Sequence, residues 1–149
     1  MDTAVGLCAA RLKGEEGVRR FAYNDATGAR VSCLPGGRLT IGIGVNLETG
    51  LDDAEITMLT EHRLTVTEEQ IAGFQWYKFT DVTRQSVLLD LAFNLGVTGL
   101  LHFPRMLAAV LAKDWGTASE ELLDSRAFAQ EPHRIAPLAT LLLNGGANA

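Results

Sequence analysis

Residues 15–25 read EEGVRRFAYND. The stretch places two adjacent carboxylates, Glu15 and Glu16, before Gly17, and a single aspartate, Asp25, nine residues after Glu16. Gly17 is a natural end for a preceding helix, because glycine readily adopts the left-handed backbone that ends helices. From residue 21 to residue 47 glycine and β-branched residues become more frequent. The stretch therefore marks the change from a first helix to a β-rich region.

Helical periodicity covers most of the chain on either side of this region. Asp2 or Thr3 is expected to cap the first helix, and Asp52 or Asp53 the segment that follows it beyond the β-rich region. That segment reads as one long helix or two shorter ones, from the spacing of Ile56, Leu59, Arg63, Val66 and Ile71, with its acids exposed to solvent. Between the helices, the Pro-Gly-Gly at 35–37 predicts the turn of a hairpin that ends in the TIGIG strand, residues 40–44.

Residues 80–96, TDVTRQSVLLDLAFNLG, are apolar around most of a helical circumference. They predict the central buried helix, ending at Gly96. Pro104 suits the first turn of the next helix, with Gly116 after its end, and Thr117 begins a predicted capping box. A last helix is expected from Pro132 to the NGG at 144–146. The order predicts an α+β fold.

The length of 149 residues suits a single domain. We expect a β-rich lobe at about residues 17–50 and a helical lobe of residues 1–16 plus 51–149. No apolar run is long enough for a membrane span, and no basic segment precedes an apolar one at the N-terminus. We therefore expect no membrane insertion and no signal peptide.

The charge argues against a nucleic-acid partner. Of the net charge of −5, residues 1–50 carry six Lys/Arg and five Asp/Glu, and residues 51–149 carry seven and thirteen. Phosphate binding relies on a basic surface, which this balance does not supply.

Cysteine and histidine spacing argues against a metal site. Cys8 and Cys33 are expected to be reduced thiols, with a Cys8–Cys33 disulfide as the alternative. His62, His102 and His133 show no ligand spacing, so we expect no metal and no cofactor.

Glu16 and Asp25 form a candidate acid pair. The negative end of the first helix should raise the pKa of Glu16, whereas Asp25, in a polar turn, should stay ionised. Two carboxyl groups in unlike environments are typical of glycosidic-bond cleavage. Taken alone, the spacing also fits an ordinary helix end followed by a surface turn.

The segments GEEGVRRFAYND and LTIGIG, residues 14–25 and 39–44, together resemble the N-terminal signature of the T-even phage lysozyme family. The resemblance continues in family order through RQSVLLDLAFNLGVTGL, FPRML, LLDSRAFAQEPHR and LATLLLNG and covers nearly the whole chain. It implies a lysozyme-like fold with a cleft between the two lobes. It also implies a muramidase that inverts while cleaving the β-1,4 bond between N-acetylmuramic acid and N-acetylglucosamine.

The resemblance also implies roles for particular residues. Glu16 would be the general acid, and Asp25 would activate a water that Thr40 helps to hold. Arg134 matches an arginine that pairs with the catalytic glutamate, which would oppose the upward shift of its pKa. The other two matches, Phe93 and Asn94, correspond to positions at the cleft wall, although Phe93 equally suits core packing at a helix end.

The chain departs from the family in one region that matters to the site. The fifteen residues from Asp25 to Thr40 exceed the family's spacing, so residues 29–38 are expected to enlarge the hairpin. The assignment of Thr40 depends on this insertion looping out.

The implied partner is bacterial peptidoglycan, approached by a monomer. The protein would be made in the cytoplasm of the host bacterium and would act on the wall after release, or as a virion component. Two alternatives stay open: a lytic transglycosylase on the same fold, and a non-catalytic wall-binding phage protein.

Overall fold

The computed structural model describes residues 2–15, 18–24, 27–31 and 38–146. The described residues are mostly helical, with one two-stranded antiparallel sheet, which is compatible with the predicted α+β class. The elements are α1 (Ala4–Glu15), β1 (Thr40–Ile41), β2 (Val45–Asn46), the 3-10 helix η1 (Leu47–Thr49), α2 (Asp53–Ile71), α3 (Gln75–Lys78), α4 (Val82–Leu101), α5 (Pro104–Ala112), α6 (Trp115–Leu123), α7 (Arg126–Gln130) and α8 (Pro132–Asn144).

The sheet is a short hairpin. Its first strand begins at Thr40, as predicted, but ends at Ile41, whereas the predicted strand continued to residue 44. Thr40 pairs with Asn46 and Ile41 with Val45, so residues 42–44 form the turn and are not strand. Gly42 and Gly44 have φ values of +61° and +96°, which glycine adopts without steric cost. The predicted Pro-Gly-Gly turn at 35–37 lies outside the described residues. A separate antiparallel bridge joins Tyr23 to Arg30.

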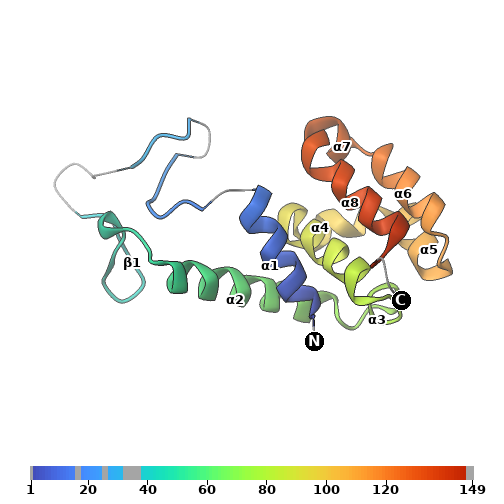
Figure 1. Ribbon diagram of the computed structural model, residues 1–149, viewed down its shortest axis with the longest axis horizontal. Coiled ribbons are helices and arrows are strands. Elements are labelled where there is room, and N and C mark those ends of the chain that lie inside the picture. The colour runs from blue at the N-terminus through green and yellow to red at the C-terminus, as the bar shows by residue number, and fades with distance from the viewer. Residues whose placement is uncertain (1, 16–17, 25–26, 32–37, 147–149) are drawn as a thin grey trace.

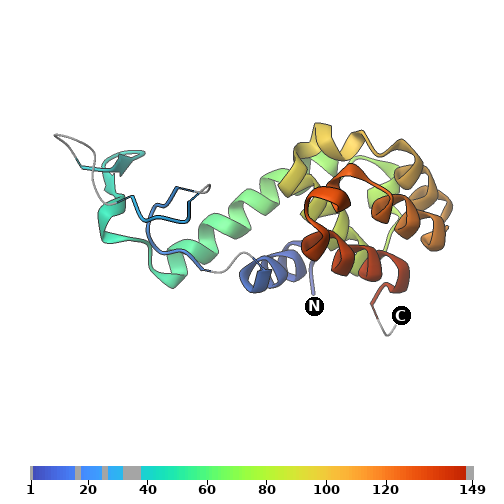
Figure 2. The same ribbon diagram turned by 90° about the horizontal axis from the view of Figure 1, so that it is seen from above.

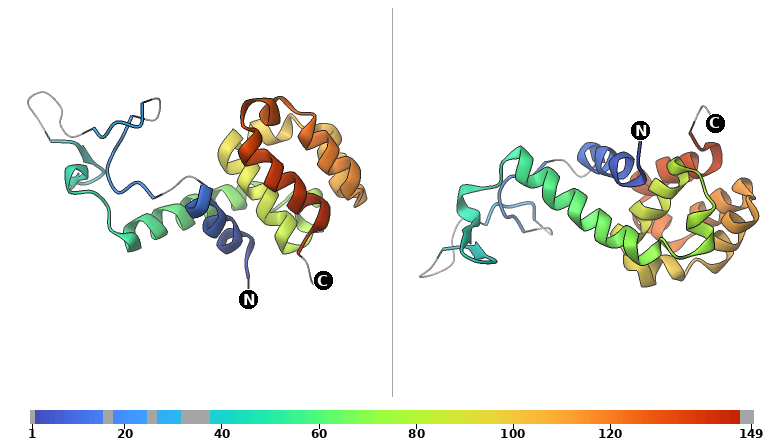
Figure 3. Two further views of the ribbon diagram at one scale, coloured as in Figure 1. Left: turned by 45° about the horizontal axis from the view of Figure 1, so that its top comes forward. Right: turned by 90° about the horizontal axis from the view of Figure 1, so that it is seen from below.

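Helix α2 is one long helix that connects the hairpin to the helical part of the molecule (Figures 1 and 2). Asp52 begins it with a capping box: its carboxylate accepts from the Glu55 N–H, and its own N–H donates to the Glu55 carboxylate, each at 2.8 Å. The two buried residues of α2, Leu64 and Ile71, both lie in its second half, and of the positions whose spacing predicted the helix only Ile71 is buried. The half nearer the hairpin extends beyond the other helices, as Figure 3 shows from two further directions.

Helix α4 is the centre of the core, as its composition predicts. Val87, Leu88 and Leu89 are fully buried, and α1, α2 and α8 pack against the helix. Its α-helical backbone is interrupted at Gly96, where φ is +76° and ψ is +156°. The prediction that Gly96 ends the helix is thus correct for the backbone, although helical turns resume after it. This break ends the straight part of α4 just beyond Phe93.

The C-terminal helices confirm some predicted boundaries and correct others. Pro104 opens α5, and Gly145 follows α8. Gly116 does not end α5, since Lys113 does so in the left-handed conformation. The predicted capping box at Thr117 was also wrong, because Asp114 caps α6 and accepts from the Thr117 N–H at 3.1 Å. The short helix α7 was not predicted.

Among the described helices, none is by itself long and apolar enough to cross a membrane. Helices α4 and α5 together meet those criteria, but they are bent by 105° relative to each other.

Candidate functional site

A hollow of about 240 Å³, here called the groove, lies where α1, α2 and α4 meet the segment after α1. Its lining combines apolar, aromatic and basic side chains: Leu12, Lys13, Val18, Arg19, Tyr23, Ile56, Thr60 and Phe93. Lining of this kind suits a ligand that has both an apolar face and polar groups.

The segment after α1 is held against the start of α2. The Arg20 guanidinium pairs with the Asp53 carboxylate at 2.8 Å, and the Leu51 N–H donates to the Arg20 carbonyl oxygen at 2.7 Å. Gly50 has a φ of +76°, and a Cβ there would lie 2.7 Å from the Phe21 ring. Glycine at position 50 therefore permits both the turn and the close approach of Phe21.

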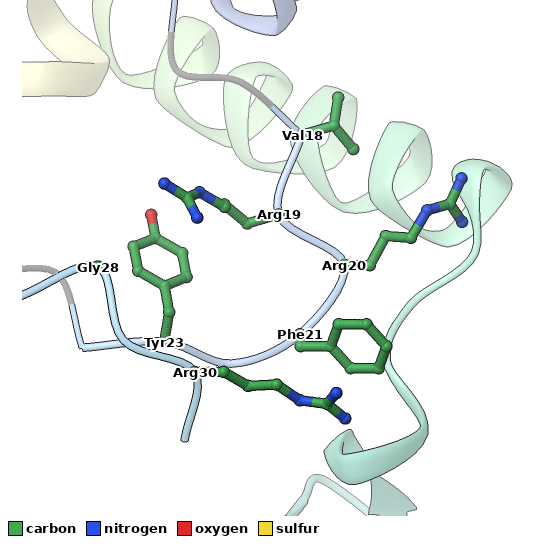
Figure 4. A pocket seen from close by; sticks show the side chains of 7 residues that line it. All are labelled: Val18, Arg19, Arg20, Phe21, Tyr23, Gly28 and Arg30. Atoms are coloured by element: carbon green, nitrogen blue, oxygen red, sulfur yellow. The ribbon is translucent and has the colours of Figure 1, made fainter. Parts of the chain in front are cut away.

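Arginine and aromatic side chains line a second hollow, which shares Val18, Arg19 and Tyr23 with the groove (Figure 4). The guanidinium carbon of Arg19 lies 5.3 Å from the centroid of the Tyr23 ring, and that of Arg30 lies 3.6 Å from the Phe21 centroid. Cation–π contacts of this kind orient the two guanidinium groups. The Arg30 guanidinium also donates to the Glu48 carbonyl oxygen at 3.0 Å.

Phe93 is the predicted site residue that lines the groove. Phe93 as a whole residue is 39% exposed, which does not fit the alternative of core packing at a helix end. Asn94, the next residue, is exposed and donates to the Glu131 carboxylate at 3.5 Å, at the start of α8. Thr40 is exposed on β1, and its hydroxyl donates to the Arg38 carbonyl oxygen at 3.3 Å. Thr40 is not among the residues that line the groove.

Glu16 and Asp25, the predicted acid pair, lie outside the described residues, and so does Cys33. In the sequence Glu16 falls between two residues that line the groove, Lys13 and Val18. Its catalytic role, like that of Asp25, stays a prediction.

Arg134 lies on α8 with its side chain only 12% exposed. Its guanidinium donates to Asp90 Oδ1 at 3.1 Å, and Arg11 Nε donates to Asp90 Oδ2 at 2.9 Å. Burial raises the pKa of the Asp90 carboxyl, although the nearby Arg11 charge acts to lower it. Sequence reasoning missed Asp90. Its signal was a single acid within the apolar run SVLLDLA, residues 86–92.

Cys8 is a free, buried thiol on α1 beside Asp90. Burial, followed by the nearby Asp90 charge, raises the pKa of this thiol to about 12. A thiol with so high a pKa is a poor nucleophile at neutral pH. Across the described part of the chain, no three His, Cys, Asp or Glu side chains are grouped as metal ligands would be.

No family model matches the chain. The chain is similar to a phage protein. This relative is the pre-baseplate central spike protein Gp5 of Enterobacteria phage T4, which is 36% identical over 166 aligned residues. The alignment covers 90% of this chain and 27% of the T4 protein, so the chain matches about a quarter of that protein's length. This similarity supports the phage association predicted from the sequence.

Proposed function

We propose that the protein is a muramidase that cleaves the β-1,4 bond between N-acetylmuramic acid and N-acetylglucosamine in peptidoglycan. The observation that carries the proposal is the groove. Residues on both sides of Glu16 in the sequence line it, together with Phe93, the residue expected at a cleft wall. The similarity to a phage central spike protein over 90% of the chain supports a role at the bacterial wall.

In the proposed reaction Glu16 protonates the leaving oxygen as general acid. Asp25 activates a water on the opposite face of the sugar, and Thr40 helps to hold that water. An inverting mechanism needs the two carboxyl groups roughly 6.5–9.5 Å apart, which leaves room for the water. A positioned general acid typically contributes about 10²–10⁴-fold to the rate.

The remaining residues of the proposed site bind the sugar or pair with the general acid. The Phe93 ring offers a flat apolar surface at the groove, as sugar rings require, and Asn94 offers an amide beside it. Arg134 is proposed to pair with Glu16, which would set the pKa of that acid. The fold would be lysozyme-like: one domain with a β-rich lobe at about residues 17–50 and a helical lobe from the remainder. The protein would act on the wall as a monomer after release or as part of a virion.

Digestion of purified peptidoglycan tests the proposal. The wild type, Glu16→Gln and Asp25→Asn are compared, with Glu15→Gln as the matched control, because it removes the neighbouring carboxylate. The products are reduced and identified by mass. Reducing-end muropeptides from the wild type and Glu15→Gln, with a loss of at least about 100-fold in both other variants, are expected.

Other outcomes identify the alternatives. Anhydro products would make the protein a lytic transglycosylase and leave Asp25 without its role. An absence of products from wild-type protein on several wall types, together with retained wall binding, would indicate a non-catalytic wall-binding protein.

A further inference from the structure

Asp90 is a charged residue in the most deeply buried part of the molecule. It lies on α4 between Leu89 and Leu91, and none of its surface is exposed to solvent. An ionised carboxylate in such a place is costly unless it is paired and hydrogen-bonded. Asp90 meets this requirement with charged groups from two other helices.

The partners of Asp90 come from α1 and α8. Arg11 Nε donates to one carboxylate oxygen at 2.9 Å, and the Arg134 guanidinium donates to the other at 3.1 Å. The two arginine side chains are themselves only 14% and 12% exposed. Arg11 also donates to the Ser86 carbonyl oxygen at 2.7 Å, which fixes its guanidinium against α4. One carboxylate therefore orients a guanidinium on each of two helices.

Stability alone is a weak explanation for this arrangement. Replacing a buried ionic cluster by apolar side chains of similar volume is often neutral or stabilising. Such a cluster does fix the orientation of side chains, because a carboxylate holds the N–H donors around it in hydrogen-bond geometry. Here the fixed donors include Arg134, the arginine proposed to pair with the general acid. Arg11 lies one helical turn before the end of α1 at Glu15, and Glu16 is the next residue in the sequence.

We propose that Asp90 is a positioning residue for hydrolysis, which holds the Arg134 guanidinium and the last turn of α1 in their working orientation. The inference rests on the proposed function. Among the described residues, the charged or titratable groups that face Asp90 are Cys8 and Arg11 on α1 and Arg134 on α8. Cys8 stays protonated at neutral pH, so the two arginines are the charges that Asp90 orients.

Asp90→Asn tests the proposal, because it keeps the shape and removes the charge. The amide can accept from one arginine, but its NH₂ group faces the other as a second donor. The matched control is Asp81→Asn, which removes the carboxylate that pairs with Arg84 at the N-terminal end of the same helix. Both variants and the wild type are assayed on peptidoglycan for kcat, KM and the pH profile, with folding checked by circular dichroism.

We expect kcat to fall about 10–100-fold in Asp90→Asn, with KM within about twofold of the wild type, because a small misplacement of a catalytic group is costly. The pH profile should shift as well, since a displaced Arg134 no longer sets the pKa of the acid. Asp81→Asn should retain the wild-type kcat and pH profile. Equal kcat and equal profiles in folded Asp90→Asn and wild type would overturn the inference and leave the proposed function intact.

Two further results are informative. If Asp90→Asn does not fold, Asp90→Glu keeps the charge but displaces it by one methylene. A lower kcat in that variant supports the proposal, and an unchanged kcat overturns it. If the wild type itself produces no reducing ends, the proposed function fails, and the positioning role fails with it.

Discussion

The guanidinium carbon of Arg84 lies 4.0 Å from the centroid of the Trp115 ring. The same side chain donates to the carbonyl oxygens of Leu142 and Leu143 at 2.7 and 2.8 Å, and to the Asp81 carboxylate at 2.6 Å. The last carbonyl groups of a helix have no partner within the helix. Arg84 therefore joins α4, α6 and the end of α8 through one planar group.

Arg84→Lys is expected to lower the free energy of unfolding by about 2–3 kcal/mol, because an ammonium group cannot reach both carbonyl oxygens and stack on the ring. Urea denaturation measures the change. Arg63→Lys, on the exposed surface of α2, is the control and should leave the midpoint unchanged. Equal midpoints for Arg84→Lys and the wild type would show that the contacts contribute little.

Asp81 is expected to stabilise the protein at neutral pH and to lose this effect in acid. Burial alone would raise the pKa of Asp81, but hydrogen bonds from the Arg84 guanidinium and backbone N–H more than offset it, so the pKa lies below its ordinary value of 3.8. A carboxyl whose pKa is lower in the folded state contributes stability above its unfolded pKa, and loses it as the pH falls through the folded value. Urea titrations of wild type and Asp81→Asn from pH 7 to pH 2 should therefore converge at the acid end.

Cys8 is expected to destabilise the fold in alkali. Burial and then Asp90 raise the pKa of this thiol from 9.0 to about 12, so between these values the unfolded chain loses a proton that the folded chain keeps. Unfolding free energy should fall by roughly 1.4 kcal/mol per pH unit in this window. Cys8→Ala should have a shallower slope from pH 9 to pH 11, even if its stability at pH 7 is lower. Parallel slopes for the two proteins would contradict the assignment.

Arg19 is expected to contribute to substrate binding, given the proposed function. Within the described part of the chain, its guanidinium forms no hydrogen bond or ion pair, and it stands over Tyr23 at the groove. Arg19→Gln should raise KM on peptidoglycan by about 3–10-fold and leave kcat unchanged, because an exposed charge contributes modestly to affinity. Arg105→Gln makes the same charge change on the exposed surface of α5, a helix that supplies none of the described residues lining the groove, and should behave as the wild type. A fall in kcat alone would place Arg19 in the chemistry and not in binding.

Local signals predicted much of the helical framework. Asp52, Pro104 and Gly145 each act through one backbone group or one fixed dihedral, so their sequence context is sufficient. The predicted start of α6 was wrong because two local signals compete there. Thr117 with Glu120 and Asp114 with Thr117 both satisfy the spacing of a cap, and only the left-handed Lys113 decides between them.

The candidate site was less predictable, because it depends on tertiary contacts. The pattern of α4 predicted a buried helix, whereas Phe93 at the groove was expected only from the family resemblance. The pattern did not predict that Asp90 would be buried with Arg11 and Arg134, since those partners are 79 and 44 residues away. The spacing of apolar residues likewise did not predict which residues of α2 are buried, because periodicity assumes a neighbour along the whole helix.

The single long helix α2 carries Ile56 and Thr60, one wall of the groove, on its uncovered half, while Ile71 is fixed in the core. At 1.5 Å per residue, roughly 22 Å separates Ile56 from Ile71, so a tilt of about 5° at the buried end would displace Ile56 by roughly 2 Å. For a given tilt, the uncovered half of α2 thus moves further than its buried end. A small rotation of α2 about its buried end would move Ile56 and Thr60 relative to Phe93 on α4, and would thereby change the width of the groove between them.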